Sequence, residues 1–292
     1  MDDGQGFGRR LRAAMSAHGP LCAGIDPHRE LVEGWGLTFD LAGVERFAMT
    51  CVEALGGHVA ALKPQSAFFE VFGAAGVALL ERVVVGARDL GSLVILDVKR
   101  GDIGSTMDAY AHAFLGPHAV APPDAITVSP YLGYESLRPA VDLAADQGRG
   151  VFALCLTSNP EGRTVQHATL DGEAVAASVA RGAADDNAGA AARGELGHVG
   201  LVVGATVGTA VHDLGIDLAA VNGPILAPGV GAQGATAADL HEVFGSALSD
   251  VLASSSRSIL RAGPEVSALR DAARAEAQTL HTLRPVRRYR ER

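Results

Sequence analysis

The 292-residue chain has little of what marks an exported, disulfide-bonded or membrane-bound protein. Its three cysteines, Cys22, Cys51 and Cys155, are far apart, and their odd number argues against a disulfide framework or a structural zinc site. Residues 1–8 contain no apolar segment typical of a signal peptide, and no run approaches the roughly 18 apolar residues of a membrane-spanning helix. We therefore expect a cytoplasmic protein with buried, reduced thiols and no membrane partner.

Positive charge is scarce, since the formal net charge is −9. Nonspecific binding of nucleic acid depends on many Lys and Arg contacts with phosphates, so we expect no nucleic acid partner. An anionic small ligand would need a local cluster of positive charge. The basic segment 284–292 is expected to be a solvated, disordered tail.

Lysine is almost absent, because only Lys63 and Lys99 occur among 24 cationic residues and the others are arginine. Arginine rarely gives up its proton, whereas the pKa of a lysine can be shifted so that the side chain acts as an acid or a base. The two lysines are therefore candidates for chemistry. Chance in an arginine-rich composition explains the count about equally well.

Short apolar segments alternate with Ala-rich segments of helical periodicity, which is typical of a parallel sheet covered by helices. Eight such alternations favour a closed (β/α)8 barrel, or TIM barrel, and we predict a single domain over residues 1–283. The predicted strands are Leu21–Ile25, Val59–Lys63, Leu93–Asp97, Ala125–Val128, Val151–Leu156, Val199–Val203, Ile225–Ala227 and Asp250–Ala253. The predicted helices are Asp40–Leu55, Gly73–Leu90, Thr106–Phe114, Gly133–Ala145, Gly172–Gly189, Ala205–Leu214, Ala237–Phe244 and Pro264–Leu283.

A doubly wound nucleotide-binding sheet is the alternative architecture, and it would need a GxGxxG turn after an early strand. The first predicted strand is instead followed by Asp26 and Pro27. The Gly-rich run 229–234 comes after the seventh predicted strand, where barrels commonly bind phosphate.

Charged residues end the first three predicted strands, and the active sites of such barrels form at the carboxyl ends of the strands. These residues are Asp26, Lys63 and Asp97, with Lys99 and Asp102 following Asp97. Side chains two apart on a strand share a face, so Asp97 and Lys99 should point the same way. We predict an alternating row of Asp26, Lys63, Asp97 and Lys99. Such a row is costly to desolvate, which makes it more often functional than structural.

The alternating charges of this row favour one kind of reaction, the loss of a carboxylate followed by protonation of carbon. An ammonium group between carboxylates stays protonated, which suits Lys99 as a general acid and disfavours a Schiff base. The carboxylates would repel a substrate carboxylate, and the ammonium would stabilise the carbanion that remains when that carboxylate leaves. This chemistry needs no metal and no organic cofactor.

Two other segments offer groups for binding a ligand. Residues 157–160 carry hydroxyl and amide groups that could form hydrogen bonds with the polar edge of a ligand ring. A turn or a helix cap uses the same residue types. The Gly-rich run 229–234 and Arg257 could bind a phosphate together, through backbone amides, the Gln233 side chain and the guanidinium group. A flexible turn with a surface arginine is the alternative.

The segment Asp97-Val98-Lys99-Arg100-Gly101-Asp102-Ile103 resembles the DxKxxDI signature of the orotidine 5′-phosphate decarboxylase family. DxKxxD alone is shared by related barrels that act on sugar phosphates. Segments 21–27, 63–70, 157–160 and 228–234 resemble the longer, type 2 subgroup of the decarboxylases as well. The similarity therefore extends over most of the chain, from about residue 20 to residue 262.

The resemblance implies cofactor-independent decarboxylation of orotidine 5′-monophosphate (OMP) to uridine 5′-monophosphate (UMP) and CO2, the last step of de novo pyrimidine synthesis. Lys99 would protonate the C6 carbanion, and Asp97 would lie against the departing carboxylate. Lys63 would link the charges and hold the ribose hydroxyls together with Asp26.

The resemblance also implies a homodimer with shared active sites. Asp102, Ile103 and Thr106 match positions that this family contributes across the dimer interface to the partner's site. Ser158 would contact the pyrimidine. The phosphate-binding positions would be Gly229, Gly231, Gln233 and Arg257.

Two other functions remain open from the residues alone. A metal-dependent sugar-phosphate aldolase or epimerase would use the same barrel, but Lys63 beside Asp97 would put positive charge where the metal ion should lie. A catalytically silent phosphate-binding barrel would bind nucleotides without turnover, and it would leave the two lysines unexplained.

Overall fold

The computed structural model describes residues 6–230 and 237–283. Within these residues, eight parallel strands form a closed barrel in the order β1-β10-β9-β8-β5-β4-β3-β2, which confirms the predicted (β/α)8 architecture. The basic segment 284–292 lies outside the described residues. The barrel strands are β1 (Leu21–Ile25), β2 (Ala61–Pro64), β3 (Leu93–Arg100), β4 (Ala125–Val128), β5 (Gly150–Leu156), β8 (Val199–Val203), β9 (Ile225–Pro228) and β10 (Val251–Ser255).

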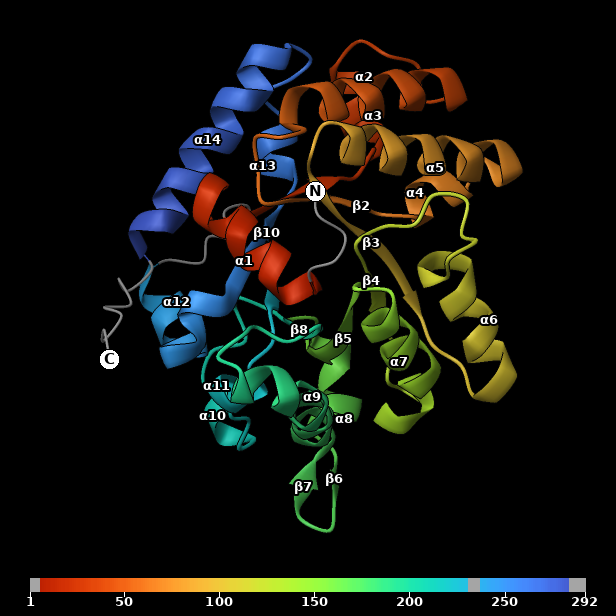
Figure 1. Ribbon diagram of the computed structural model, residues 1–292. Helices are drawn as coiled ribbons and strands as arrows, with labels where there is room; N and C mark the ends of the chain where they lie inside the picture. Colours follow the sequence, from red (N-terminus) through yellow and green to blue (C-terminus); the bar gives the residue numbers. More distant parts are fainter. Residues whose placement is uncertain (1–5, 231–236, 284–292) are drawn as a thin grey trace.

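Helices surround the barrel (Figure 1). The longer helices are α1 (Phe7–His18), α3 (Leu41–Leu55), α5 (Gly73–Asp89), α6 (Gly104–Leu115), α7 (Arg138–Asp146), α9 (Val175–Ala192), α12 (Ala237–Phe244) and α14 (Val266–Leu283). The short helical elements are α2 (Arg29–Gly34), α4 (Ala67–Glu70), η1 (Tyr134–Leu137), η2 (Pro160–Gly162), α8 (Arg163–Gln166), α10 (Ala210–Asp213), α11 (Leu218–Val221), η3 (Gly245–Asp250) and α13 (Arg257–Leu260).

The structure corrects the helix predicted over residues 205–214. Only α10, at the end of that range, is helical, and residues 205–209 form turns. This stretch contains Thr, Val and Gly208, which has a positive φ of 59°. Glycine and β-branched residues have low helix propensity, so the segment favours turns despite its apolar pattern.

A small hairpin replaces the start of the helix predicted over residues 172–189. Strands β6 (Thr169–Leu170) and β7 (Glu173–Ala174) pair in antiparallel orientation. The two residues between them, Asp171 and Gly172, both have positive φ, 53° and 88°. This conformation is the one that two-residue hairpin turns require, and an Asp-Gly pair is typical of it.

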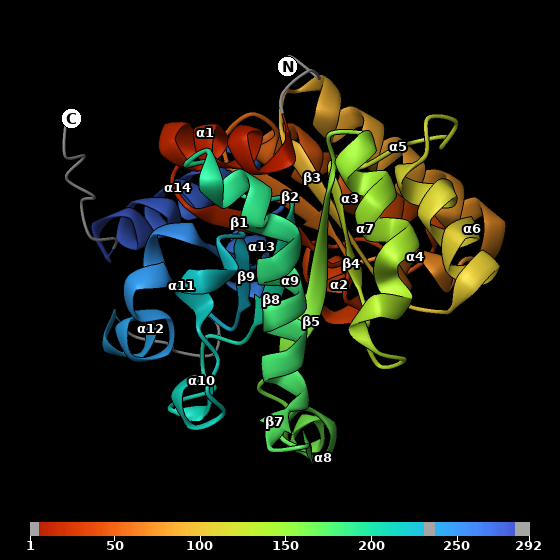
Figure 2. The same ribbon diagram turned by 60° about the horizontal axis from the view of Figure 1, so that its bottom comes forward.

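Helix α1, which was not predicted, covers the end of the barrel at which the strands begin (Figure 2). Its buried residues Phe7, Leu11 and Met15 recur every four positions and therefore lie on one helical face. They pack into the barrel interior, and the Phe7 ring meets Phe152 of β5 edge to face, with centroids 5.9 Å apart. The hairpin and α10 lie at the opposite end of the barrel (Figure 2).

Side chains along the strands alternate between the barrel interior and the surrounding helices. On β3, Leu93 and Ile95 pack in the interior cluster, whereas Val94 and Leu96 pack toward the helices. The same alternation turns Asp97 inward, two residues after Ile95. Lys99 lies beyond an irregularity in β3, and its inward direction is shown by its contact, since Nζ lies 2.6 Å from Asp97 Oδ1. On β2, Ala61 is interior, so Lys63 points inward as well. The predicted shared face of Asp97 and Lys99 is therefore confirmed.

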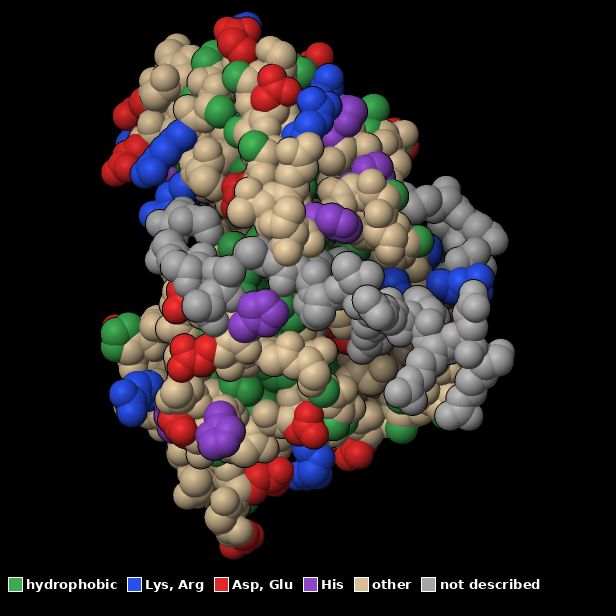
Figure 3. Space-filling view, turned by 90° about the vertical axis from the view of Figure 1, so that its left-hand side faces the viewer, with side chains coloured by type: hydrophobic (Ala, Val, Ile, Leu, Met, Phe, Trp, Pro, Cys, Tyr) green, Lys and Arg blue, Asp and Glu red, His purple; other side chains and the backbone are tan. Residues whose placement is uncertain are grey.

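The surface carries charges of both signs. On the face shown in Figure 3, acidic and basic side chains are interspersed among apolar and polar ones. Among residues 6–230 and 237–283, none of the helices combines the length and apolar character needed to cross a bilayer.

We expect Phe7→Ala to lower the free energy of unfolding by about 3–5 kcal/mol, because it leaves a cavity between α1 and the barrel floor. Urea denaturation followed by circular dichroism measures the change. Leu170→Ala is the matched control, since the Leu170 side chain is 76% exposed at the hairpin and should change stability by about 0.5 kcal/mol or less. Equal losses in the two variants would contradict the role assigned to α1.

Candidate active site

A cavity of about 360 Å³ opens at the carboxyl ends of the barrel strands. Its volume falls within the range typical of small-molecule sites. Inward-facing apolar residues of β5, β8 and β9 form its floor, and charged and hydroxyl side chains form its rim. The lining residues that matter here are Asp26, Lys63, Asp97, Lys99, Thr127, Leu154, Ser158, Val202, Leu226, Gly229, Ser254, Ser256 and Arg257.

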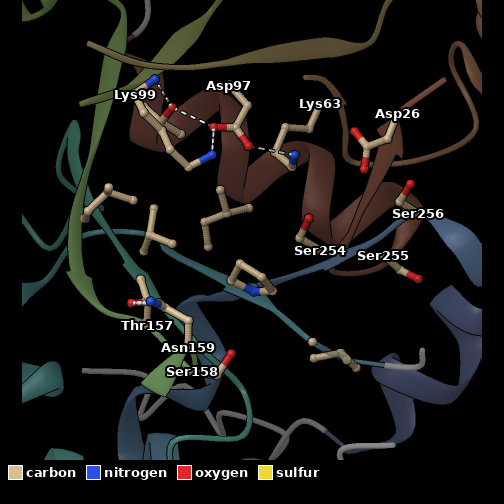
Figure 4. A pocket seen from close by; sticks show the side chains of 18 of the residues that line it. Asp26, Lys63, Asp97, Lys99, Thr157, Ser158, Asn159, Ser254, Ser255 and Ser256 are labelled. Atoms are coloured by element: carbon tan, nitrogen blue, oxygen red, sulfur yellow. Dashed lines mark hydrogen bonds and ion pairs between the residues drawn. The ribbon is translucent and has the colours of Figure 1, made fainter. Parts of the chain in front are cut away.

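Asp97 is the centre of the charged row, and both lysines of the chain donate to it (Figure 4). Lys63 Nζ lies 2.9 Å from Oδ2, and Lys99 Nζ lies 2.6 Å from Oδ1. Two neutral donors complete the set, because Gln65 Nε2 lies 3.0 Å from Oδ2 and Thr127 Oγ1 lies 2.8 Å from Oδ1. The Asp97 side chain is 8% exposed, and its carboxylate still has two donors on each oxygen.

The charged neighbours of Asp97 and Lys63 keep both side chains ionised. Burial by itself would raise the pKa of Asp97, but Lys63 and Lys99 outweigh it and lower the pKa to about 2. Burial would lower the pKa of Lys63, but the carboxylates of Asp26 and Asp97 hold it above its ordinary value. Asp97 and Lys63 are therefore a stable ion pair at neutral pH.

The two lysines differ in their access to the cavity. The Lys63 side chain is 9% exposed, whereas the Lys99 side chain is 46% exposed. Lys99 also has a positive φ of 44°, which is unusual for a residue with a side chain and is often found at functional sites. Lys63 is thus a fixed charge, and Lys99 is the ammonium that can reach a ligand.

Asp26 follows Lys63 in the row, in the predicted order (Figure 4). It has no ion pair within 4.0 Å among the described residues, so electrostatic attraction rather than contact links it to Lys63. Its Oδ1 is buried and unpartnered, and so is Oγ of Ser256 nearby. Unpartnered buried oxygens beside a cavity are suited to binding hydroxyl groups of a ligand.

Residues 157–159 lie across the cavity from the charged row (Figure 4). Gln166 fixes this turn, because its side chain accepts from the Thr157 amide and donates to Oγ1 of Thr157. Thr157 Oγ1 then donates to Asn159. Ser158 has no such bond and lines the cavity, so it remains available to a ligand.

The candidate phosphate-binding residues are only partly described. Gly229, with a positive φ of 98°, and the exposed Arg257 at the start of α13 both line the cavity. Gly231 and Gln233 lie outside the described residues. The structure thus brings Gly229 and Arg257 to the same cavity as Ser254 and Ser256.

Asp102, Ile103 and Thr106 do not line this cavity. Asp102 Oδ1 accepts from the Ile103 amide, and Thr106 is exposed on α6. Ile103 is 61% exposed, and other large apolar side chains follow β2 and β4 on the same end of the barrel. These are Val71, Tyr131 and Leu132, which are 68%, 76% and 52% exposed.

Sequence reasoning missed Gln65, Thr127 and the serines of β10. Gln65 and Thr127 follow the same inward alternation as the residues that were found, since Gln65 is two residues after Lys63 and Thr127 is two after the interior Ala125. Their neutral side chains gave no charge signal. Alternation applied inside the fourth predicted strand and two residues past the second would have placed both side chains on the inward face, although it does not predict their hydrogen bonds.

The cysteines are free and buried, as predicted. Cys22 lies below the charged row in the barrel interior, where burial raises the pKa of its thiol to about 12. It therefore stays protonated and is a packing residue rather than a nucleophile.

We expect the stability of the protein to depend on the ionised Asp97 in a definite pH range. Its pKa is lower in the folded chain than the ordinary 3.8, so the ionised carboxylate stabilises the fold by about 2 kcal/mol above pH 4. This contribution decreases as the pH falls from about 4 toward 2. Urea denaturation of the wild type and of Asp97→Asn at several pH values measures it. A difference between them that does not change with pH would contradict the assignment.

Comparisons with known proteins agree with the motifs. The model of the orotidine 5′-phosphate decarboxylase / HUMPS family matches residues 19–272. A protein named orotidine 5′-phosphate decarboxylase from Streptomyces coelicolor is 58% identical over 278 residues, which cover 94% of this chain and 97% of that protein. One of the same name from Salinispora tropica is 59% identical over 270 residues, covering 92% and 95%.

Solved structures are similar as well. A chain from Streptomyces avermitilis is 55% identical, with a TM-score of 0.90 over 96% of both chains. The OMP decarboxylase of Leishmania donovani is 30% identical, with a TM-score of 0.73 over 96% of this chain and 98% of that one. The resemblance carried by the DxKxxDI segment is therefore confirmed, and the chain belongs to the orotidine 5′-phosphate decarboxylase / HUMPS family.

Proposed function

We propose that the chain decarboxylates OMP to UMP and CO2 with Lys99 as the proton donor and without a metal or an organic cofactor. Relatives that are 58% and 59% identical over nearly the whole chain are named for this activity, which confirms the predicted enzyme class. The observation that carries the residue roles is the pairing of Asp97 with both lysines at the mouth of the barrel.

The nucleotide would lie across the cavity. Arg257 and the backbone at Gly229 would bind the phosphate, together with Gly231 and Gln233 from the Gly-rich run. Asp26, with its unpartnered oxygen, and Lys63 would bind the ribose hydroxyls. Ser158, on the side of the cavity opposite the charged row, would contact the pyrimidine. This pose places C6 of the pyrimidine toward Asp97 and Lys99.

The chemical step breaks the bond between C6 and the carboxylate of OMP. The electron pair stays on C6 while CO2 leaves, and Lys99 Nζ then gives its proton to C6, so UMP forms and a neutral amine remains. The half-exposed Lys99 side chain regains a proton from solvent. Because Asp97 stays ionised down to about pH 2, it repels the substrate carboxylate at neutral pH and favours its departure.

A metal-dependent reaction on sugar phosphates is less compatible with this site. Such a reaction needs a divalent ion held by carboxylates. The Asp97 carboxylate already accepts four donors, and two of them are ammonium groups. A cation placed against Asp97 would be repelled by both lysines.

We also propose a homodimer with shared sites. Asp102, Ile103 and Thr106 do not reach the cavity of their own chain, which fits a role at the partner's site. Ile103, Tyr131 and Leu132 are large apolar side chains exposed in the single chain, which supports the proposal because a subunit interface would bury such groups. The three free, buried thiols suit the reducing cytoplasm, and we place the reaction there.

An absorbance assay with OMP tests the function. We expect Lys99→Ala to lower kcat by about 10²-fold to 10⁴-fold, because it removes the general acid, while UMP binding measured by calorimetry stays within about threefold. Wild-type turnover should be the same with and without a chelator. Near-normal turnover by Lys99→Ala, or loss of wild-type activity on chelation, would contradict the proposal.

Mixed dimers test the shared site. Chains with Asp102→Ala and chains with Lys99→Ala should each be nearly inactive, but a hybrid dimer has one site with Lys99 from one chain and Asp102 from the other. With random exchange of subunits, roughly a quarter of the wild-type activity should return, as expected for a two-fold symmetric dimer. Mass spectrometry verifies the exchange. Verified hybrids without recovered activity would rule out the shared site.

A further inference from the structure

We infer that Thr127 is a positioning residue for the proton donor, because its hydroxyl joins the backbone of Lys99 to the carboxylate of Asp97. Thr127 Oγ1 accepts from the Lys99 amide at 2.9 Å and donates to Asp97 Oδ1 at 2.8 Å. Thr127 lies on β4 and is 1% exposed, whereas Asp97 and Lys99 lie on β3. The inference rests on the proposed function, in which Lys99 protonates C6.

The need for this bond comes from an irregularity in the barrel. Strand β3 pairs with β4 at Leu96 and Ile126, and pairing resumes only at Arg100 and Val128. Strand β3 therefore has two more residues than β4 between these points. Such bulges leave backbone groups without ladder partners and turn side chains to new directions, often next to active sites. The Lys99 amide is one of these groups, and the Thr127 hydroxyl replaces its missing strand partner.

The direction of the hydrogen bond between Thr127 and Asp97 is also fixed. A threonine hydroxyl has one proton. Because Oγ1 accepts from the Lys99 amide, its own proton is free for Asp97 Oδ1, the same oxygen that accepts from Lys99 Nζ at 2.6 Å. The backbone and the ammonium group of Lys99 are thus both tied to one carboxylate oxygen, the backbone through Thr127 and the ammonium directly.

This arrangement controls where Lys99 can point. Its φ of 44° is a conformation that costs energy for a residue with a side chain, so surrounding bonds must hold it. When the ammonium leaves Asp97 to protonate C6, Thr127 still donates to Asp97 and still holds the Lys99 amide. Without the hydroxyl, the backbone could relax toward ordinary strand geometry and carry Nζ away from C6.

Thr127→Val tests the inference, since valine keeps the shape and removes the hydroxyl. We expect kcat to fall by about 10-fold to 100-fold, because the partly buried Lys99 amide loses its partner and the proton donor is no longer held in place. KM and UMP affinity should change by about threefold or less, because the phosphate and ribose contacts are separate. Thr127→Ser, which keeps the hydroxyl, should recover kcat to within about threefold of the wild type.

Ser92→Ala is the control, because it also removes a hydroxyl group that accepts from a backbone amide. Ser92 immediately precedes β3, is 2% exposed and accepts from the Gly57 amide. The Ser92→Ala substitution should leave kcat unchanged. Wild-type kcat in folded Thr127→Val, or failure of Thr127→Ser to recover kcat, would overturn the inference. If Thr127→Val does not fold, the same comparison is made with Thr127→Ala and Thr127→Ser. An inactive wild type would contradict the proposed function instead.

Discussion

A single buried carboxylate imposes most of the constraints on this site. Asp97 is ionised inside a barrel, and an ionised group with too few partners in such a place is very unfavourable. Four donors from three neighbouring strands therefore have to converge on it. Lys63 and Gln65 come from the segment of β2, Lys99 from β3 itself and Thr127 from β4. The register of these strands at their carboxyl ends is consequently tied to the charge of one residue.

The barrel interior is divided into an apolar part and a polar part. Helix α1 and the inward side chains of the strands fill the amino end, where Phe7 and Phe152 meet. The charged row lies directly above this filled region. Because water is excluded from below, the charges interact through a medium of low dielectric constant and are held more strongly than on a surface. Packing at one end of the barrel thus supports the electrostatics at the other.

The sequence was sufficient for the barrel and the charged row because both depend on strand alternation. Period-two alternation predicted that Asp97 and Lys99 share a face, and the order of consecutive strands predicted that Lys63 lies beside them. Helix α1 was missed because its apolar residues, Phe7, Leu11 and Met15, precede the first strand and resemble no βα unit. Thr127 was missed because its role depends on the bulge in β3, and no local pattern encodes the lost backbone pairing.

The near absence of lysine has a practical consequence for chemical labelling. One of the two lysines, Lys63, is 9% exposed and bound to Asp97, while the other, Lys99, is 46% exposed at the cavity mouth. An acylating reagent that targets side-chain amines therefore meets one accessible ε-amino group, and it lies in the site itself. A reactive group built into a nucleotide analogue would therefore have Lys99 as the accessible lysine of the site, where the neighbouring carboxylate, by favouring the ammonium form, would make modification faster at high pH.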